Sequence, residues 1–386
     1  MNRVCSIFTQ VLRLLPRTEF EQAVQRHGAE KHAKGFSCWT QLVAMLFCQL
    51  GQARSLREII GGLASSEGKL KHLGVDKAPK RSTLAYANEH RTWELYETVF
   101  HQVLEKCRTA IGGGTKFRFK NKLVSLDATS IDLCASLFDW AKFKRTKGAV
   151  KLHLLLDHEG YLPGFAVLTD GQVSDIAVAR RLAFQPGTIL VVDRSYIDYA
   201  WLHRLGEQGV FFVTRMKADM KYKVVRKRKT PRHGSIRRDE EIVIRSMKYG
   251  LELRLRRIVL WDEQRQDKLV FLTNHMELAA RTIAAIYKDR WQIEIFFKSM
   301  KQLLRVKTFV GTSANALKIQ MWTALIAMLI LKFLQWRAKF GWSLSNLVAL
   351  LRYQLFVYRD LQQWLDDPFQ PPPALAGLAD QLVLEF

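Results

Sequence analysis

Three acidic residues have the surroundings that metal-dependent phosphoryl transfer requires. Asp127 and Asp193 each end an apolar run that predicts a strand, and Glu294 lies in a segment of helical periodicity. Carboxylate oxygens are the ligands that Mg²⁺ prefers, and carboxylates from separate elements can hold two ions about 3.5–4 Å apart. One ion would activate an attacking water or 3′-hydroxyl, and the other would stabilise the leaving oxygen. Taken alone, either aspartate could equally be an ordinary turn or cap residue.

The run Tyr287-x2-Arg290-x3-Glu294-x6-Lys301 places four residues on one stripe of a predicted helix. At about 100° per residue with Tyr287 at zero, Arg290 lies at about −60° and Glu294 at about −20°. Lys301 lies at about −40° on the same scale. The stripe therefore presents one carboxylate among cations and an aromatic ring. The alternative is a solvated face with an Arg290–Glu294 salt bridge, and such pairs contribute little stability.

Two further residues and an apolar face border this stripe. Lys298 and Trp291 flank it, and we assign both to a DNA-binding surface. Trp291 could stack on an unpaired base near a cut, or it could belong to the core. Five apolar residues lie between about −80° and −140° on the same scale and predict the buried face of the helix. These residues are Ile286, Ile293, Phe297, Met300 and Leu304.

The segments that position the two aspartates predict a mixed sheet of class α/β. Three leading strands predict an antiparallel meander, and the later alternation of strand and helix predicts parallel crossovers. That order is the order of the ribonuclease H-like fold, in which Asp127 and Asp193, each at the end of its predicted strand, would lie at the mouth of the sheet. The predicted strands are Leu123–Asp127, Val150–Asp157, Phe165–Thr169, Thr188–Asp193 and Val210–Thr214, with helices at Ile176–Leu182 and Tyr199–Gln208.

Composition shifts predict three parts. Residues 1–112 have helical periodicity and end at Gly112-Gly113-Gly114, residues 116–310 form the catalytic domain, and residues 311–386 form a helical C-terminal region with a tail. A basic insertion rich in predicted strands occupies about 215–275. In the first part, Ser55-x-x-Glu58 has the form of a capping box. Pro79–Thr83 predicts the start of another helix, with Ser82 or Thr83 as its N-cap. The flanking cations Lys80 and Arg81 would suit binding to a phosphate or a DNA groove, and the alternative is an ordinary capped surface helix.

The charge of the chain favours a polyanion as partner. Its 386 residues include 60 Lys and Arg against 36 Asp and Glu, a formal charge of +24. Cations that neutralise phosphates release condensed counterions, although some basic proteins merely adhere without specificity.

The five cysteines form no C-x2-C pair, which fits a reducing compartment. The segment MNRVCSIFTQ lacks the apolar core of a signal peptide, and the apolar stretch Met321–Leu331 is too short to span a bilayer. We therefore expect a cytoplasmic, nucleoid-associated protein with no membrane partner and a buried helix at that stretch.

Other ionisable residues have simpler interpretations. His153 lies on a predicted strand and could approach the metal site, but a packed strand histidine is the usual case. Asp157, Asp170 and Asp175 border predicted turns, where Asp is common.

The sequence resembles bacterial insertion-sequence transposases of the Asp-Asp-Glu class, in the group with the Tyr-x2-Arg-x3-Glu-x6-Lys motif. The matching text is IYKDRWQIEIFFKSMKQLLRVKTFVGTSANALKIQ, with SLDATSIDL around the first aspartate and TILVVDRSYIDY around the second. The N-terminal segments GFSCWTQLVAMLFCQLGQARSLREI and RSTLAYANEHR also resemble the N-terminal domain of that group. The resemblance covers nearly the whole chain.

The resemblance implies a role for each motif residue. Asp127, Asp193 and Glu294 match the metal-binding triad, which takes Mg²⁺ with Mn²⁺ as a substitute. Three residues match the positions that grip DNA phosphates near the cleaved transposon end: Tyr287, Arg290 and Lys301. A basic β-rich insertion is also a feature of the family.

The resemblance also implies a reaction and partners. We expect cleavage at transposon terminal inverted repeats, followed by transfer of the freed 3′-hydroxyl into target DNA, by a homodimer on double-stranded DNA. Two alternatives remain open: a catalytically silent DNA-binding protein derived from a transposase, and a nuclease that cuts but does not join.

Overall fold

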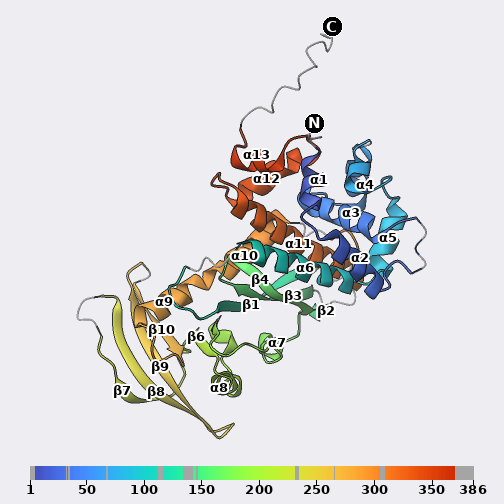
Figure 1. Cartoon of the computed structure of the whole chain (residues 1–386). Coiled ribbons are helices and arrows are strands. Elements are labelled where there is room, and N and C mark those ends of the chain that lie inside the picture. The colour runs from blue at the N-terminus through green and yellow to red at the C-terminus, as the bar shows by residue number, and fades with distance from the viewer. Residues whose placement is uncertain are drawn as a thin grey trace. The chain divides into compact units, whose positions relative to one another are not determined.

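The computed structural model of the chain describes residues 5–31, 33, 35–66, 68–111, 116–133, 142–144, 147–230, 234–264, 266–304 and 309–369. Two compact units divide the chain (Figure 1). One comprises Leu104–Trp322 and contains the sheet, and the other comprises Met1–Val103 with Thr323–Phe386 and is helical.

The helical unit brings segments from both ends of the sequence together. The backbone amide of Ile7 donates to the carbonyl of Val357 at 3.0 Å. Ser55 caps its helix as expected, because its hydroxyl accepts from the amide of Glu58. The helices of this unit are α1 (Ile7–Leu12), α2 (Arg17–Arg26), α3 (Cys38–Leu50), α4 (Leu56–Ala64), η1 (Leu70–Leu73), α5 (Arg81–His90), α12 (Leu344–Gln354) and α13 (Leu361–Asp366).

Helix α5 corrects one expectation from the sequence. It begins at Arg81 with Lys80 as N-cap, and no side chain caps it. The expected caps Ser82 and Thr83 were wrong, because both residues already lie inside the first turn.

Two long helices, α6 (Glu94–Ile111) and α11 (Ala314–Arg337), have residues in both units. By length and composition alone α11 could cross a membrane, but 83% of its most apolar window is buried inside the protein. This burial agrees with the buried helix predicted at Met321–Leu331.

The described residues of the other unit form a ten-stranded sheet in the order β2-β3-β1-β5-β6-β10-β9-β8-β7, with β4 paired to β3. As predicted, β1, β3 and β4 pair antiparallel, whereas β1 with β5 and β5 with β6 pair parallel. The strands are β1 (Leu123–Leu133), β2 (Lys142–Lys144), β3 (Lys147–Asp157), β4 (Leu162–Asp170), β5 (Ile189–Val192), β6 (Phe211–Arg215), β7 (Lys223–Lys227), β8 (Ile236–Ser246), β9 (Leu251–Asp262) and β10 (Asp267–Thr273).

The register of β1 and β5 brings two aspartates to the same level of the sheet. Their parallel pairing ends at Leu126 opposite Val192, so Asp127 and Asp193 are the next residues on neighbouring strands. Asp193 follows the end of its strand as predicted. Asp127 does not end its strand, because β1 continues in antiparallel pairing with β3 as far as Leu133.

Helices cover both faces of the sheet. Alternate residues of β5 belong to different core clusters: Leu190 packs with Trp201 of one helix, and Ile189 packs with Ile286 of another. Figure 1 accordingly shows α7 and α8 on one side of the sheet and α9 with α10 on the other. These elements are α7 (Asp175–Ala179), η3 (Arg194–Tyr196), α8 (Tyr199–Glu207), α9 (Ala280–Asp289) and α10 (Trp291–Leu303).

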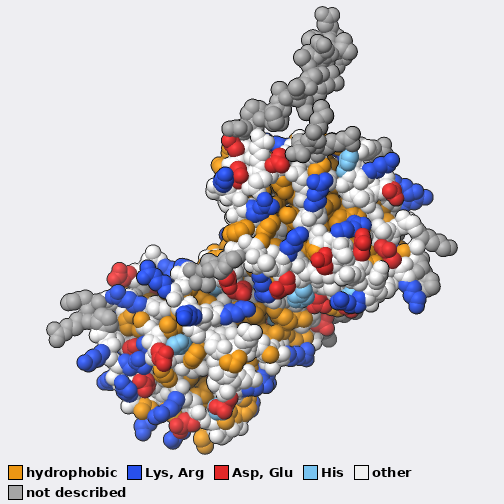
Figure 2. Space-filling model, viewed as in Figure 1, with side chains coloured by type: hydrophobic (Ala, Val, Ile, Leu, Met, Phe, Trp, Pro, Cys, Tyr) orange, Lys and Arg blue, Asp and Glu red, His pale blue; other side chains and the backbone are white. Residues whose placement is uncertain are grey.

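The predicted insertion is rich in strands, and it extends the mixed sheet itself. Strand β10 pairs antiparallel with β6, and β9, β8 and β7 follow in turn. All five residues of β7, at the edge, are exposed, including Lys223, Arg226 and Lys227. On the face seen in Figure 2, Lys and Arg side chains are frequent over these strands.

Candidate active site

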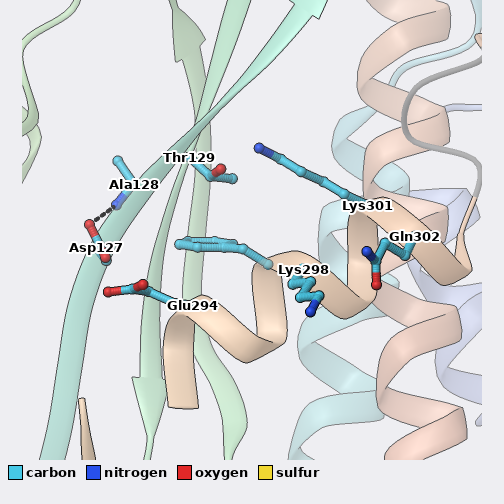
Figure 3. A pocket seen from close by; sticks show the side chains of 8 residues that line it. Asp127, Ala128, Thr129, Glu294, Lys298, Lys301 and Gln302 are labelled. Atoms are coloured by element: carbon cyan, nitrogen blue, oxygen red, sulfur yellow. Dashed lines mark hydrogen bonds between the residues drawn. The ribbon is translucent and has the colours of Figure 1, made fainter. Parts of the chain in front are cut away.

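Three carboxylates meet at the mouth of the sheet. Asp127 comes from β1, Asp193 follows β5, and Glu294 lies on α10, which packs against β1. Figure 3 shows Asp127 and Glu294 pointing toward one another across a pocket that Lys298 and Lys301 also line. Asp127 and Glu294 thus line one pocket, and Asp193 lies at the same level of the sheet on the neighbouring strand, so three separate elements carry the three predicted residues.

Arg290 bridges two of these carboxylates. Its Nη1 lies 3.2 Å from Oδ2 of Asp127, and its Nη2 lies 2.6 Å from Oε1 of Glu294. The Arg290 side chain is only 10% exposed, so these bonds are not the solvated surface pair considered from the sequence. Burial lowers the pKa of Arg290, but Tyr287, Glu294 and Asp127 raise it more, and the guanidinium remains charged.

The electrostatics of Asp127 show that the carboxylates interact. Burial raises the pKa of Asp127 to about 6, and the amide of Ala128, which donates to it at 2.8 Å, lowers the pKa in part. Arg290 also lowers it, whereas the charges of Glu294 and Asp193 raise it. Like charges raise a carboxyl pKa when they lie close together, so this site favours a bound cation.

Asp193 is held by its own turn and by Tyr287. Its Oδ2 accepts from the amide of Ser195 at 3.3 Å, and its Oδ1 accepts from the Tyr287 hydroxyl at 3.4 Å. Burial raises the pKa of Tyr287 to about 12, and the Arg290 guanidinium lies 5.4 Å from its ring. Tyr287 thus links Asp193 to the arginine that bridges the other two carboxylates.

The helix expected through Glu294 is broken. Helix α9 ends at Asp289, α10 begins at Trp291, and the amide of Arg290 donates to the carbonyl of Tyr287, three residues earlier. The break turns Arg290 inward to Asp127, which arithmetic on one straight helix could not anticipate. The predicted buried face is confirmed in full, since all five of its residues are at most 6% exposed: Ile286, Ile293, Phe297, Met300 and Leu304.

Two of the remaining predicted DNA-binding residues, Lys298 and Lys301, line the pocket. Lys298 is exposed, and the Lys301 ammonium donates to the carbonyl of Ser130 at 2.8 Å. Trp291 is 54% exposed, so it does not belong to the core.

The residues present fit a divalent cation by their chemistry. Three oxygen-donating carboxylates face one site, and a cation, Arg290, already holds two of them. In the described part of the chain no group of three His, Cys, Asp or Glu side chains is gathered tightly enough to hold a metal ion. Arg290 lies between two of the three carboxylates, because its guanidinium contacts an oxygen of Asp127 and an oxygen of Glu294.

A buried network next to the site was missed from the sequence. The Ser125 hydroxyl lies 2.7 Å from Nε2 of His158, and Nδ1 of His158 lies 2.6 Å from Oδ2 of Asp289. The Lys116 ammonium lies 2.6 Å from the other oxygen of Asp289. These bonds tie β1 to the residue directly before Arg290. The only signal for this network in the sequence was Asp289, an acidic residue directly before Arg290 in the predicted helix.

The other ionisable candidates are structural. His153 is 1% exposed, its Nε2 lies 2.9 Å from the Thr169 hydroxyl, and burial lowers its pKa to about 4. This supports the packed interpretation. Asp175 is the first residue of α7 and pairs with Lys151 at 3.1 Å. Asp157 accepts from the amide of Glu159 in a turn, and Asp170 ends β4.

A mixed sheet with aspartates on two adjacent strands and a glutamate on a covering helix is the arrangement of the ribonuclease H-like fold. The chain belongs to the transposase DDE domain family, which matches residues 118–330. Residues 4–76 match a second family, described as a domain of unknown function, DUF4372.

Relatives agree with this assignment. The chain is 29% identical to the putative transposase y4zB of Sinorhizobium fredii, over 74% of this chain and 80% of that protein. It is also 29% identical to the probable transposase for insertion sequence element IS5377 of Geobacillus stearothermophilus, over 70% of this chain and 72% of that protein. A piggyBac transposase synaptic complex is similar at 8% identity with a TM-score of 0.39, covering 97% of this chain and 86% of that one, which is too weak to carry an argument. The protein is thus a DNA transposase with a ribonuclease H-like fold.

Proposed function

We propose that Asp127, Asp193 and Glu294 are the catalytic residues of this transposase. The observation that carries the proposal is the proximity of these carboxylates at the sheet mouth, with the largely buried guanidinium of Arg290 bridging Asp127 and Glu294. Carboxylates that share one small site destabilise each other unless a cation is present. The arrangement suits cleavage of DNA at the transposon end and transfer of the 3′-hydroxyl into a target.

We propose Mg²⁺ as the cofactor, with Mn²⁺ as a substitute and two ions at the site. Asp127, Asp193 and Glu294 would hold them, and the bound ions would supply the activated nucleophile and stabilise the leaving oxygen. Tyr287 keeps Asp193 oriented through its hydroxyl. The amide of Ala128 keeps Asp127 oriented through Oδ1.

The DNA would be held by side chains that surround the carboxylates. Arg suits a phosphate through paired donors, and Lys through a point charge. Lys298 and Lys301 line the pocket and would contact the backbone of the bound end. Two of the five donors of Arg290 contact Asp127 and Glu294, and among the described residues its Nε has no hydrogen-bond partner, so in this proposal Arg290 could donate to a phosphate as well. Trp291, which is exposed at the start of α10, would stack on an unpaired base.

We further propose a homodimer on double-stranded DNA, with terminal inverted repeats and target DNA as substrates, acting in the cytoplasm on the nucleoid. Residues 1–112 would form the DNA-binding domain, residues 116–310 the catalytic domain and residues 311–386 the C-terminal region. The formal charge of +24 supports a polyanionic partner.

The test compares Glu294→Gln with Glu252→Gln, an exposed glutamate on β9. Duplex DNA carrying the ends of the element that encodes the chain is incubated with Mg²⁺ or Mn²⁺. We expect Glu294→Gln to lose cleavage by on the order of 10³-fold or more while still binding the ends, and Glu252→Gln to cleave normally. Undiminished cleavage by Glu294→Gln would refute the assignment. A pre-cut end separates joining from cutting alone, because only a transposase transfers it into a second duplex.

A further inference from the structure

The segment Lys116–Lys122, which leads into β1, alternates cations with apolar or amide side chains in the sequence KFRFKNK. The three residues between the cations are partly buried, whereas four residues are exposed: Lys116, Arg118, Lys120 and Lys122. The segment contains no acidic residue. It therefore presents four positive charges to solvent within seven residues, and we call it the basic tract.

The residues between the cations anchor the basic tract to the sheet. The rings of Phe117 and Phe119 are stacked, with their centroids 5.3 Å apart, and both pack against the core cluster that contains Leu123 of β1. The side-chain amide of Asn121 donates to the carbonyl of Gly187 at 2.6 Å. Because these contacts hold one side of the tract against the protein, the cations at the alternate positions lie on its outer side.

The two central cations of the basic tract lack an acidic partner. Among the described residues, neither the Arg118 guanidinium nor the Lys120 ammonium forms an ion pair or a hydrogen bond. At the two ends of the tract, Lys116 pairs with Asp289 at 2.6 Å, and Lys122 lies 3.5 Å from Asp157. Exposed cations without acidic partners favour a polyanion, because each phosphate that they neutralise releases condensed counterions.

One end of the basic tract lies beside the carboxylate site. Asp289, which pairs with Lys116, directly precedes Arg290, and the Arg290 guanidinium lies 3.2 Å from Asp127. Seven residues reach at most about 25 Å, which is less than the roughly 35 Å of one turn of duplex DNA. A duplex that is cut at the carboxylates and continues along the tract would therefore meet these cations within about one helical turn of the cut.

We propose that the basic tract binds the phosphate backbone of double-stranded DNA beside the cleavage site, through Arg118 and Lys120. Contacts with phosphates position a duplex and carry no base information, so this contact does not depend on the DNA sequence. The tract extends the DNA-binding surface beyond the pocket that Lys298 and Lys301 line. This inference rests on the proposed function, because cleavage at the carboxylates is what brings the duplex to the tract.

The first experiment measures how DNA binding by the full chain depends on salt, without divalent metal. A double variant, Arg118→Gln with Lys120→Gln, is compared with wild type on the element's end duplex and on an unrelated duplex of equal length. Each lost phosphate contact makes the slope of log K against log salt less steep by about 0.9. We therefore expect a slope less steep by about two for both duplexes.

The matched control is the double variant Arg337→Gln with Lys339→Gln, which removes the same charge from exposed positions at and beyond the end of α11. It should keep the wild-type slope. Both double variants change only exposed side chains, so both should keep the urea-unfolding midpoint of the wild type.

The second experiment locates the contact along the DNA. End duplexes carry a neutral methylphosphonate in place of one phosphate, at each position within about ten base pairs of the cut. We expect the wild type to lose affinity at one or two of these positions. The Arg118→Gln, Lys120→Gln variant should lose nothing further there, because the cations that face those phosphates are gone.

Three results would overturn the inference: an unchanged salt slope in the tract variant, a loss of affinity confined to the end duplex, or wild-type sensitivity of that variant at every methylphosphonate position. The tract variant retains the three carboxylates, so cleavage by Glu294→Gln tests the proposed function separately. If cleavage depends on Glu294 but the salt slope does not depend on the tract, only the inference fails. If cleavage does not depend on Glu294, the proposed function fails, and the placement of the tract beside the cut fails with it.

Discussion

The Nη1 atom of Arg290 lies 3.2 Å from Oδ2 of Asp127, although 163 residues separate the two in the sequence. The same guanidinium holds Glu294 at 2.6 Å. A metal ion and Arg290 would therefore compete for the same carboxylate oxygens. The arginine stabilises the site in the absence of a metal, since it neutralises two carboxylates that would otherwise repel each other.

Replacing Arg290 tests this competition. We expect Arg290→Gln to bind Mn²⁺ without DNA more tightly than wild type, by on the order of tenfold or about 1.4 kcal/mol. The same variant should bind transposon ends more weakly, because a phosphate contact is lost. Isothermal titration with Mn²⁺ measures the first effect, and a DNA shift assay measures the second. Arg245→Gln, in an exposed ion pair with Glu252, is the control and should change neither. Weaker Mn²⁺ binding by Arg290→Gln would contradict the competition.

The buried Asp289 should matter for stability more than for chemistry. It is 3% exposed, and although burial raises its pKa, hydrogen bonds from His158 and Lys116 lower the pKa more. We expect Asp289→Asn to cost about 3 kcal/mol of unfolding free energy at neutral pH, since it breaks a buried ion pair. A carboxyl group whose pKa is lowered by folding stabilises the folded chain at pH values above its usual pKa. This stabilisation is lost as the pH falls below about 4, so the difference in unfolding free energy between wild type and Asp289→Asn should narrow there.

Urea unfolding of wild type and Asp289→Asn at several pH values measures this effect. The exposed Glu252→Gln should differ from wild type by no more than about 0.5 kcal/mol throughout. A constant difference at all pH values would show that the charge of Asp289 is not responsible.

The buried His153 should make stability depend on pH between about 4 and 6.5. Its pKa is lowered by burial to about 4, with Asp175 raising it and Lys151 lowering it. The pKa of His153 is higher in the unfolded chain, so the unfolded chain binds the proton first as the pH decreases. The free energy of unfolding therefore falls through this window, by up to about 3 kcal/mol. His153→Gln should lose most of that slope when unfolding is followed against pH. If the slope persists unchanged in the variant, His153 is not buried in its neutral form.

Trp291 should affect DNA and leave the fold nearly unchanged. It is 54% exposed, so Trp291→Ala should change the unfolding free energy by less than about 1 kcal/mol. If it stacks on a base, binding to ends with unpaired bases near the cut should weaken by about 1–3 kcal/mol, with a smaller loss for fully paired ends. Fluorescence anisotropy with both duplexes compares them. Trp336→Ala, at 49% exposure in the helical unit, is the matched control. Equal losses for paired and unpaired ends would rule out stacking.

Patterns in short segments of the sequence predicted the structural features that depend on residues close together in the chain. The apolar run before Asp193 predicted a strand end, and the spacing of Ile293 and Met300 predicted a buried helix face; the structure agrees in both cases. The spacing of apolar and polar residues within a helix or strand predicts which of its faces is buried. The order of strands and helices likewise predicted the mixed sheet.

Contacts distant in sequence could not be predicted in this way. His158 and Asp289 are 131 residues apart, and no periodicity connects them. The contact of the Arg290 guanidinium with Asp127 joins residues on separate elements, and a helical wheel treats each helix in isolation. The continuation of β1 beyond Asp127 depends on its partner β3, which a single strand does not reveal.

The exposed edge strand β7 has a consequence when no DNA is present. An open strand edge offers unpaired backbone groups to any second strand, and exposed valines such as Val224 and Val225 would favour such an association. Lys223, Arg226 and Lys227 lie on the same edge and would repel an identical one. The positive charges that suit DNA therefore also protect each chain from aggregating with its copies.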